Sequence, residues 1–326
     1  MKLFDLHCDS LVEILAAGQG LDKNDFATSA QMSACFESMV QVLAIWVPPG
    51  LTGSDAWEYT ARHIEFYKSE LRRHEALLVP VKNGAALESL TGRLGCVLAL
   101  ENAAGLGGKL RNLERLAQEG VKIITLTWNG ENEFAHGVDL ARRSFRAAEK
   151  NTPAIKGGGG LKPLGRALLR EMKAMGMAAD LSHLNARGFW EAVGGDLPVL
   201  ASHSNCRAVY DHPRGLSDAQ LTALAQLGAP IGISFAYLRR TQGKGIFAAR
   251  RDWEAICKNV THMLELGAEK SLCFGSDYDG HPAPHGLEKA ERLPLLREHL
   301  IRRGIDKKTA DAMLWGSAAA WFKRTF

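Results

Sequence analysis

The chain has 326 residues, of which 46% are hydrophobic, so it is long enough to bury a large core. Its 40 basic and 36 acidic residues leave a net charge of +4 and are spread along the chain. This distribution excludes the concentrated basic surface of a nucleic-acid-binding protein. No run of apolar residues is long enough to span a membrane.

The N-terminus reads MKLFDLHCDS, in which a charged polar motif begins by residue 5 and leaves no room for the apolar core of a signal peptide. The six cysteines include no C-x-x-C pair and are typical of reduced thiols. We therefore expect a cytoplasmic protein that binds neither nucleic acid nor membranes.

Eight short apolar runs rich in valine, isoleucine and leucine predict buried strands. In chain order they are Lys2–Leu6, Val40–Val47, Gly95–Leu100, Val121–Thr127, Met177–Leu181, Pro198–Ala201, Pro230–Phe235 and Ser271–Phe274. The runs are continuous rather than alternating, as expected for the strands of a parallel sheet that is covered on both faces.

The segments between these runs predict helices. They are Ala56–His74, Leu110–Gln118, Leu164–Met175, a helix from Ser217 to Gly228, and Trp253–Leu266. Gly120 and Gly176 stand in the C-cap position of two of them, and Ser217 begins a capping-box pattern. The alternation of strand and helix predicts one α/β domain over residues 1–326, a (β/α)8 TIM barrel. An open doubly wound sheet is the alternative topology.

A run of four glycines at 157–160 precedes one predicted helix. It lacks both the G-K-[ST] ending and the preceding strand of a phosphate-binding loop. We interpret it as a flexible loop beside the site.

Polar side chains follow most of the predicted strands at the point where each strand ends. They occur in the segments 7–9, 101–102, 128–132, 180–183, 202–205 and 275–279. The carboxyl-terminal ends of barrel strands meet at one mouth, and enzymes on this fold build their sites there. These side chains are therefore expected to lie close together.

The first of these segments is His7-Cys8-Asp9. Residues two apart in a strand share a face, so His7 and Asp9 should point into the barrel mouth while Cys8 points to the helix layer. The H-x-D pattern is weak by itself. It becomes informative only together with the other strand ends.

Five candidate metal ligands follow the first, third, fifth and sixth predicted strands: His7, Asp9, Glu101, His183 and His203. Their imidazoles and carboxylates suit Zn²⁺, with Mn, Fe or Co as alternatives. A pair of ions needs a shared ligand, and the Glu101 carboxylate can give one oxygen to each. One ion would then bind His7, Asp9 and Glu101, and the other Glu101, His183 and His203. Each residue alone has an ordinary structural explanation, such as a helix cap for Asp9, but their joint occurrence favours a metal site.

Taken together, these motifs resemble the membrane dipeptidase family (renal dipeptidase-like, peptidase M19). The matching segments are H-C-D at 7–9, A-L-E-N at 99–102, D-L-S-H at 180–183, S-H-S at 202–204, G-S-D-Y-D-G at 275–280 and P-H-G-L-E at 284–288. Other zinc barrels of the amidohydrolase type commonly have H-x-H on the first strand and a bridging lysine. The chain is thus similar to a bacterial-type member of the dipeptidase family over essentially its whole length.

The resemblance implies a dipeptidase with two zinc ions, in which a hydroxide that bridges the ions attacks the peptide bond. It further implies that Asp277 handles the proton and that Arg214 anchors the C-terminal carboxylate of the substrate. Such an anchor would explain a limit to dipeptides. Asp279 competes with Asp277 for the proton-handling role, and a solvated surface arginine is the plain alternative for Arg214.

One position departs from the family pattern. The better-known members have a histidine after the fourth strand that helps to hold the substrate, and the matching residue here is Trp128. Asn129 follows it, and His136 is a candidate substitute a few residues later. We expect all three to lie near the substrate, and the group that stabilises the oxyanion stays open.

Other functions remain open at this point. The chain could be another dinuclear barrel hydrolase, such as a deaminase, lactonase or amidase, or a metal-stabilised binding protein without catalysis. Among dipeptides, substrates of the L-Xaa-D-Xaa type are included in what the resemblance implies. The sequence fixes neither the preferred side chains nor the oligomeric state, although a homo-oligomer is compatible with such a barrel.

Overall fold

The computed structural model describes residues 1–140, 159–238 and 246–326. Part of the glycine run at 157–160 therefore lies outside the described residues. Among the helices of these described segments, none combines the length and the apolar character needed to cross a lipid bilayer.

Nine parallel strands form one sheet within the described residues. They are β1 (Lys2–Cys8), β2 (Ser38–Trp46), β3 (Leu78–Pro80), β4 (Leu94–Glu101), β5 (Val121–Thr125), β6 (Ala178–Asp180), β7 (Val199–Leu200), β8 (Ile231–Ile233) and β9 (Leu272–Phe274). The order is β7-β6-β5-β4-β2-β1-β9-β8, and a parallel bridge between Ala201 and Ile231 joins its two ends. The predicted barrel is therefore confirmed, and the open sheet is not the fold.

Strand β3 is not among the predicted strands. It pairs with the start of β4, where Leu78 is opposite Leu94 and Pro80 opposite Cys96, while β5 pairs with the later part of β4 from Leu98 onward. A three-residue segment that ends in proline carries too little apolar pattern to be recognised from sequence.

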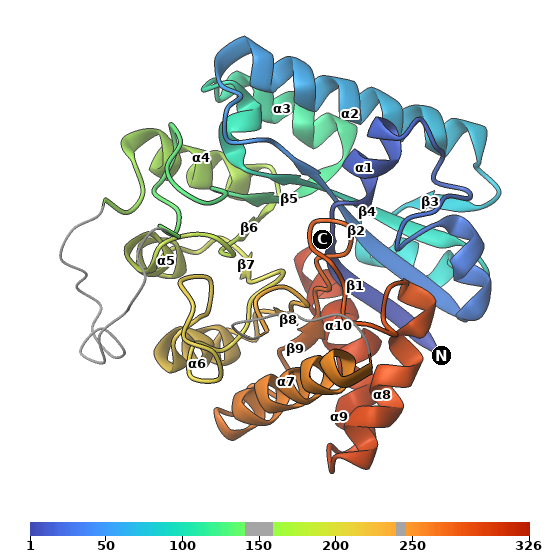
Figure 1. Ribbon diagram of the computed structural model, residues 1–326. Helices are drawn as coiled ribbons and strands as arrows, with labels where there is room; N and C mark the ends of the chain where they lie inside the picture. The colour runs from blue at the N-terminus through green and yellow to red at the C-terminus, as the bar shows by residue number, and fades with distance from the viewer. Residues whose placement is uncertain (141–158, 239–245) are drawn as a thin grey trace.

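Helices surround the strands (Figure 1). They are α1 (Ser10–Ala16), α2 (Gly53–Arg73), α3 (Arg111–Glu119), α4 (Pro163–Ala174), α5 (Ala186–Val193), α6 (Asp218–Gln226), α7 (Ile246–Glu265), α8 (Leu293–Arg302), α9 (Lys307–Asp311) and α10 (Ser317–Thr325). The capping box of Ser217 and Gln220 opens α6 as predicted. Gly120 and Gly176 take left-handed backbone angles, with φ of 93° and 63°, and terminate their helices as predicted.

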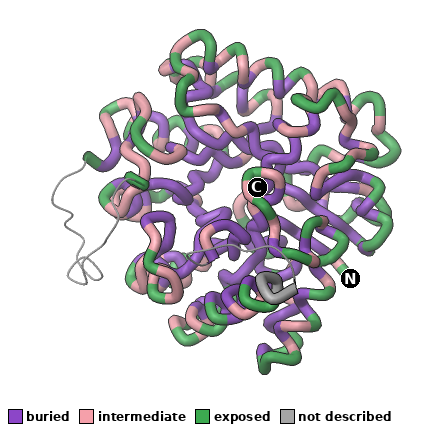
Figure 2. The backbone as a smooth tube through the Cα atoms, in the orientation of Figure 1, coloured by how far each residue is buried: buried purple, intermediate pink, exposed green. Residues whose placement is uncertain are grey.

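Successive residues of the strands point to opposite faces of the sheet and so contribute to two different apolar clusters. The inner cluster contains Phe4, Leu6, Val40, Val42, Val97, Ala99, Ile123, Ala178, Leu200 and Cys273, together with Trp321 and Phe322 of α10. The residues between them pack with the surrounding helices in a larger outer cluster. Figure 2 shows buried residues along the central strands and exposed residues mainly on the surrounding helices and loops. Because α10 packs against Phe4 near the start of β1, it fills the amino-terminal end of the barrel, and the polar residues lie at the other end.

Candidate metal centre and its surroundings

The five predicted ligands meet at the carboxyl-terminal end of the barrel. His7 lies in β1 and Asp9 follows it, Glu101 is the last residue of β4, and His183 and His203 follow β6 and β7. Each is 7% exposed or less. Buried polar groups of this kind need partners, so their convergence requires a physical explanation.

The Glu101 carboxylate lies at the centre of this group. Its Oε2 is 3.3 Å from His7 Nε2, and its Oε1 is 3.1 Å from His183 Nε2 and 3.7 Å from His203 Nε2. Asp9 Oδ2 lies 3.9 Å from His7 Nε2. The two oxygens of Glu101 thus face different sets of candidate ligand atoms, which is the arrangement expected of a carboxylate that bridges two metal ions. Cys8 belongs to the outer apolar cluster, as predicted.

The hydrogen bonds of His183 and His203 determine which ring nitrogens carry protons. His183 Nδ1 lies 2.9 Å from Asn129 Oδ1, an amide oxygen that can only accept, so this nitrogen donates. His203 Nδ1 lies 2.7 Å from the Ser202 hydroxyl, whose own proton goes to Asp180 Oδ2 at 2.6 Å. Both neutral rings therefore present a lone pair at Nε2. These two Nε2 atoms are only 2.9 Å apart.

Two lone pairs at this distance repel, and the adjacent Glu101 oxygen adds a third electron-rich atom. A cation among the three atoms removes this repulsion. On the other side of Glu101, His7 Nε2 and Asp9 Oδ1 are buried and have no hydrogen-bond partner among the described residues. The donor set therefore fits two neighbouring metal ions.

The electrostatics differ between the two sides of the site: His183 and His203 are neutral, whereas His7 keeps a proton that a metal ion would displace. Burial, reinforced by the Arg214 charge, lowers the pKa of His183 to about 4, and burial also lowers the pKa of His203. Both rings are thus neutral, the form that binds metal. Burial opposes a charge on His7, but the nearby carboxylates, Glu101 foremost, outweigh it and raise its pKa to about 10. Burial and the Glu101 charge raise the pKa of Asp9 well above its ordinary value.

Asp277 and Asp279 follow β9 and have different surroundings. The Asp279 carboxylate accepts hydrogen bonds from Ser10 Oγ at 2.5 Å and from the backbone N–H of Ala27. Asp277 faces the centre: a Cβ built on Gly280 would be 2.8 Å from Asp277 Oδ1 and 1.9 Å from Asp9 Oδ2. Asp279 therefore has a structural role in fixing the loop, and Asp277 is the carboxylate available to the site.

Arg214 is 6% exposed although its side chain is charged. Its Nη2 donates to the carbonyl of His203 at 3.0 Å, and its Nε has no partner among the described residues. It lines a small cavity with His212 and Tyr237, whose rings stack at 4.2 Å with an interplanar angle of 16°. A buried guanidinium with an unpartnered Nε is suited to an anionic ligand. The alternative of a solvated surface arginine is wrong, because Arg214 is buried.

The other three predicted substrate contacts, Trp128, Asn129 and His136, occupy different places. The Trp128 ring lies 6.0 Å from the ring of His183, and Asn129 is hydrogen-bonded to His183. Both line a cavity of about 330 Å³. The His136 ring is at the rim, where its Nδ1 is 3.1 Å from Glu131.

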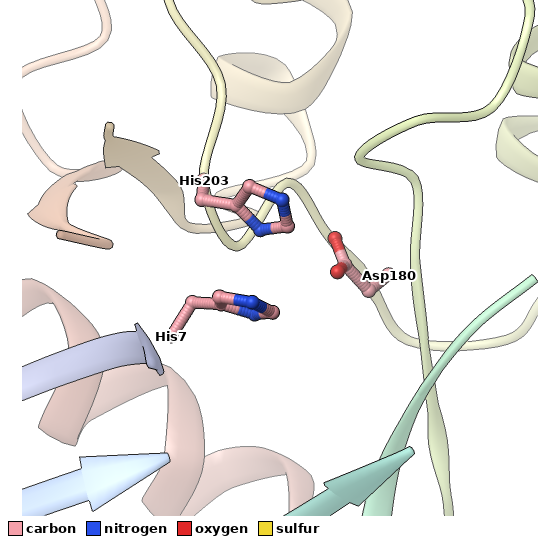
Figure 3. A group of neighbouring side chains, drawn as sticks. All are labelled: His7, Asp180 and His203. Carbon is pink, nitrogen blue, oxygen red and sulfur yellow. The ribbon is translucent and has the colours of Figure 1, made fainter. Parts of the chain in front are cut away.

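Asp180 and Ser202 are two buried residues of the recognised motifs to which the sequence assigns no role. Figure 3 shows the rings of His7 and His203 facing each other, with the Asp180 carboxylate to one side. One nitrogen or oxygen atom of each of these three side chains lies within 4.8 Å of those of the other two, close enough to share a metal ion. Asp180, however, already accepts hydrogen bonds from Thr125 Oγ1, Ser182 N, Ser202 N and Ser202 Oγ. With four hydrogen bonds to its two oxygens, Asp180 is better suited to support the neighbouring strand ends than to bind a metal ion.

Backbone strain is concentrated at the same end of the barrel. Within the described residues, the non-glycine residues with positive φ are Asn102, His183, Tyr237, Asp277 and Asp279, with values from 52° to 76°. Each such residue costs about 1–3 kcal/mol, and the surrounding structure must impose it. Strain of this kind clusters at functional sites, where it fixes side-chain directions that a relaxed loop would not hold.

A parallel barrel with imidazoles and carboxylates converging at its carboxyl-terminal mouth defines the class of barrel metallohydrolases. A family model described as membrane dipeptidase (peptidase family M19) matches residues 1–323. The chain therefore belongs to the membrane dipeptidase family. This confirms the resemblance found in the sequence motifs.

Individual relatives agree with this assignment. An uncharacterized protein encoded in the pqqA 5′ region of Klebsiella pneumoniae is 32% identical over 68% of this chain and 79% of its own length. The dipeptidase verJ of Clonostachys rogersoniana is 28% identical over 90% of this chain and 66% of its own length. The fold matches that of a metallo peptidase from Rhodobacter sphaeroides, crystallised with a phosphinate mimic of the dipeptide L-Ala-D-Ala. The TM-score is 0.86 at 22% identity, and the match covers 100% of this chain and 99% of the other.

Proposed function

We propose that this protein is a dipeptidase that uses two divalent metal ions, with zinc as the ion best suited to the donors. His7, Asp9 and Glu101 would hold one ion, and Glu101, His183 and His203 the other. The observation that carries this proposal is the pair of facing lone pairs on His183 and His203, 2.9 Å apart beside Glu101 Oε1. Together with the unpartnered atoms of His7 and Asp9, it calls for cations on both sides of Glu101.

When bound, such ions act as Lewis acids and lower the pKa of water toward neutrality, to about 7 for zinc. Asp277 would accept a proton from the attacking water and return it to the leaving amine. Burial, with a further contribution from Glu101, raises the pKa of Asp277 above its ordinary value despite the opposing charges of His7 and Arg214. A carboxyl group with a raised pKa is a better proton acceptor and a better relay.

Arg214 would bind the C-terminal carboxylate of the substrate. Its buried, unpartnered Nε would supply one donor of a two-point contact, which a longer peptide could not reach with its distant terminus. The ligand of the Rhodobacter sphaeroides relative, a mimic of L-Ala-D-Ala, supports dipeptides as the substrate class and L-Xaa-D-Xaa dipeptides among them. These points favour a dipeptidase over a deaminase, lactonase or binding protein.

Trp128 and Asn129 would border the bound substrate from the side of the 330 Å³ cavity, which gives room for a substrate side chain. Asn129 would act mainly by orienting His183, because its amide oxygen is already engaged there. The position of His136 at the rim, next to Glu131, makes it a contact for the outer part of the substrate at most.

The test is hydrolysis of a panel of L,L and L,D dipeptides, of the corresponding tripeptides and of dipeptide amides, with and without a chelator. The proposal predicts cleavage of dipeptides that stops with chelator and returns with added Zn²⁺. Cleavage of tripeptides or amides at similar rates would contradict the anchor. Absence of cleavage across the panel, by a protein shown to bind two ions, would contradict the substrate class.

A further inference from the structure

Asp180 is the most heavily engaged buried carboxylate near the candidate centre. It is 1% exposed, and its Oδ1 accepts the backbone N–H groups of Ser182 at 3.0 Å and Ser202 at 2.9 Å. Its Oδ2 accepts the hydroxyls of Thr125 at 2.8 Å and Ser202 at 2.6 Å. The carboxylate thus joins the ends of β5, β6 and β7, from which two of the candidate ligands follow.

The bond to Ser202 has a consequence for the next residue. A hydroxyl has one proton, and the short contact to the carboxylate uses it. The Ser202 oxygen must then accept from His203 Nδ1, which lies 2.7 Å away. The proton of the imidazole is thereby fixed on Nδ1, and the lone pair on Nε2 faces Glu101 and His183.

We propose that Asp180 and Ser202 form a positioning relay that fixes the tautomer and direction of His203 for metal binding. The inference rests on the proposed metal centre and adds two residues to it. Metal-bound histidines usually donate their second nitrogen to an oxygen acceptor that orients the ring. Here the acceptor is a hydroxyl that is itself fixed by a carboxylate.

Another buried carboxylate of the barrel provides an internal comparison. Asp5, at 0% exposure, accepts from Ser276 N, Ser276 Oγ and Gln41 Nε2, and so also joins neighbouring strands. Its serine partner, Ser276, has its Oγ 3.3 Å from the backbone carbonyl oxygen of His7, and the described hydrogen bonds of this hydroxyl include no imidazole. Joining strand ends through a serine therefore does not require a bond to an imidazole, and the Ser202 to His203 bond is an additional feature of the Asp180 network.

The substitution Asp180→Asn should reverse the relay. The amide oxygen would keep the place of Oδ1, where the two backbone N–H groups donate, so its NH₂ group would take the place of Oδ2 and donate to Ser202. The Ser202 hydroxyl would then donate to His203 Nδ1 and move the ring proton to Nε2. Ser202→Ala removes the link without reversing it. Thr125→Val is the matched control, because it removes another donor to the same oxygen and leaves the relay intact.

The experiment measures Zn²⁺ affinity and stoichiometry of the metal-stripped proteins by competition with a chromophoric chelator, with thermal unfolding of each stripped protein as the folding control. We expect two ions in the wild type and in Thr125→Val with unchanged affinities. Asp180→Asn and Ser202→Ala should each weaken one of the two sites by about 10- to 100-fold. If Asp180→Asn does not fold, Ser202→Ala decides the question.

Wild-type affinities in both relay variants, or an equal loss in Thr125→Val, would overturn the relay while leaving the metal centre in place. A wild type that binds no Zn²⁺ would overturn the metal centre and the relay together. The two failures are therefore distinguishable in one set of titrations.

Discussion

Replacing Arg214 by lysine tests whether this side chain anchors the C-terminal carboxylate of a dipeptide substrate. Lysine keeps the positive charge but loses the planar fork that can make two parallel bonds to a carboxylate. The side chain is 6% exposed, and its Nε is unpartnered among the described residues, so a bound carboxylate would be well shielded from water. The substitution should therefore weaken substrate binding.

The expected size follows from the bond that is lost. A hydrogen bond to a charged group contributes about 1.5–3 kcal/mol, and each 1.4 kcal/mol is a factor of ten, so KM for a dipeptide should rise about 10- to 150-fold. The carboxylate keeps the same charge in the bound substrate and in the transition state, so its anchor contributes equally to both, and kcat should change less than KM. The assay is steady-state hydrolysis of L-Ala-D-Ala, with metal content measured on the same sample.

Arg297→Lys provides the matched control, because Arg297 is similarly buried, at 7% exposure, and pairs with Glu298 and Asp311 within helices α8 and α9. It should leave KM near the wild-type value. An unchanged KM in Arg214→Lys would refute the anchor. So would an equal rise in KM for the dipeptide amide, which has no carboxylate to lose.

Other consequences concern the carboxylates of the site. Asp277→Asn should lower kcat by about 10²- to 10⁴-fold while two ions stay bound. Asp279→Asn should keep kcat but lower the free energy of unfolding by about 1–3 kcal/mol, because the Asp279 partners are Ser10 and Ala27. Measurements of activity, metal content and urea unfolding distinguish these two outcomes. Gly280→Ala should displace Asp9 and lower the metal affinity, since the new methyl group would lie 1.9 Å from Asp9 Oδ2. Gly50→Ala, which adds a methyl group in open space, should leave the metal affinity unchanged. Burial, assisted by Glu101, raises the pKa of Asp277, and a base works only when deprotonated, so kcat/KM should fall as the pH drops through that raised pKa; an acid limb at the position of an ordinary aspartate, at constant metal content, would contradict this role.

Much of the fold could be predicted because barrel strands are buried on both faces and therefore appear as continuous apolar runs. The predicted strands correspond to β1, β2 and β4 to β9, and glycines at helix ends marked their boundaries. Strand β3 was missed because three residues carry no periodic pattern. Helices α5, α8, α9 and α10 were not assigned ranges either, although Asn185 caps α5 by accepting from Gly188 N.

The candidate ligands could be found because their residue types and their positions at strand ends are both local features. Their mutual distances could not, since these depend on a β1 bulge between Asp5 and Cys8 and on the left-handed backbone of His183. The division of labour between Asp277 and Asp279 was open for the same reason. Only the folded chain shows that Ser10 and Ala27 engage Asp279.

The link between Asp180, Ser202 and His203 was also beyond the sequence, although all three residues lie in recognised motifs. The residues come from two strand ends that are 22 positions apart, and the hydroxyl direction that matters is set by tertiary contacts. Motifs identify which residues stand at a site, while hydrogen-bond partners determine which atoms are available to a ligand.

The most direct test of the central claim is the metal content of the purified protein, measured by elemental analysis for the wild type and for Glu101→Gln. We expect about two ions per chain in the wild type and loss of both in the variant, because both sets of ligand atoms share the Glu101 carboxylate. A wild type without bound metal, even after reconstitution with Zn²⁺, would contradict this expectation, as would a Glu101→Gln protein that still holds two ions.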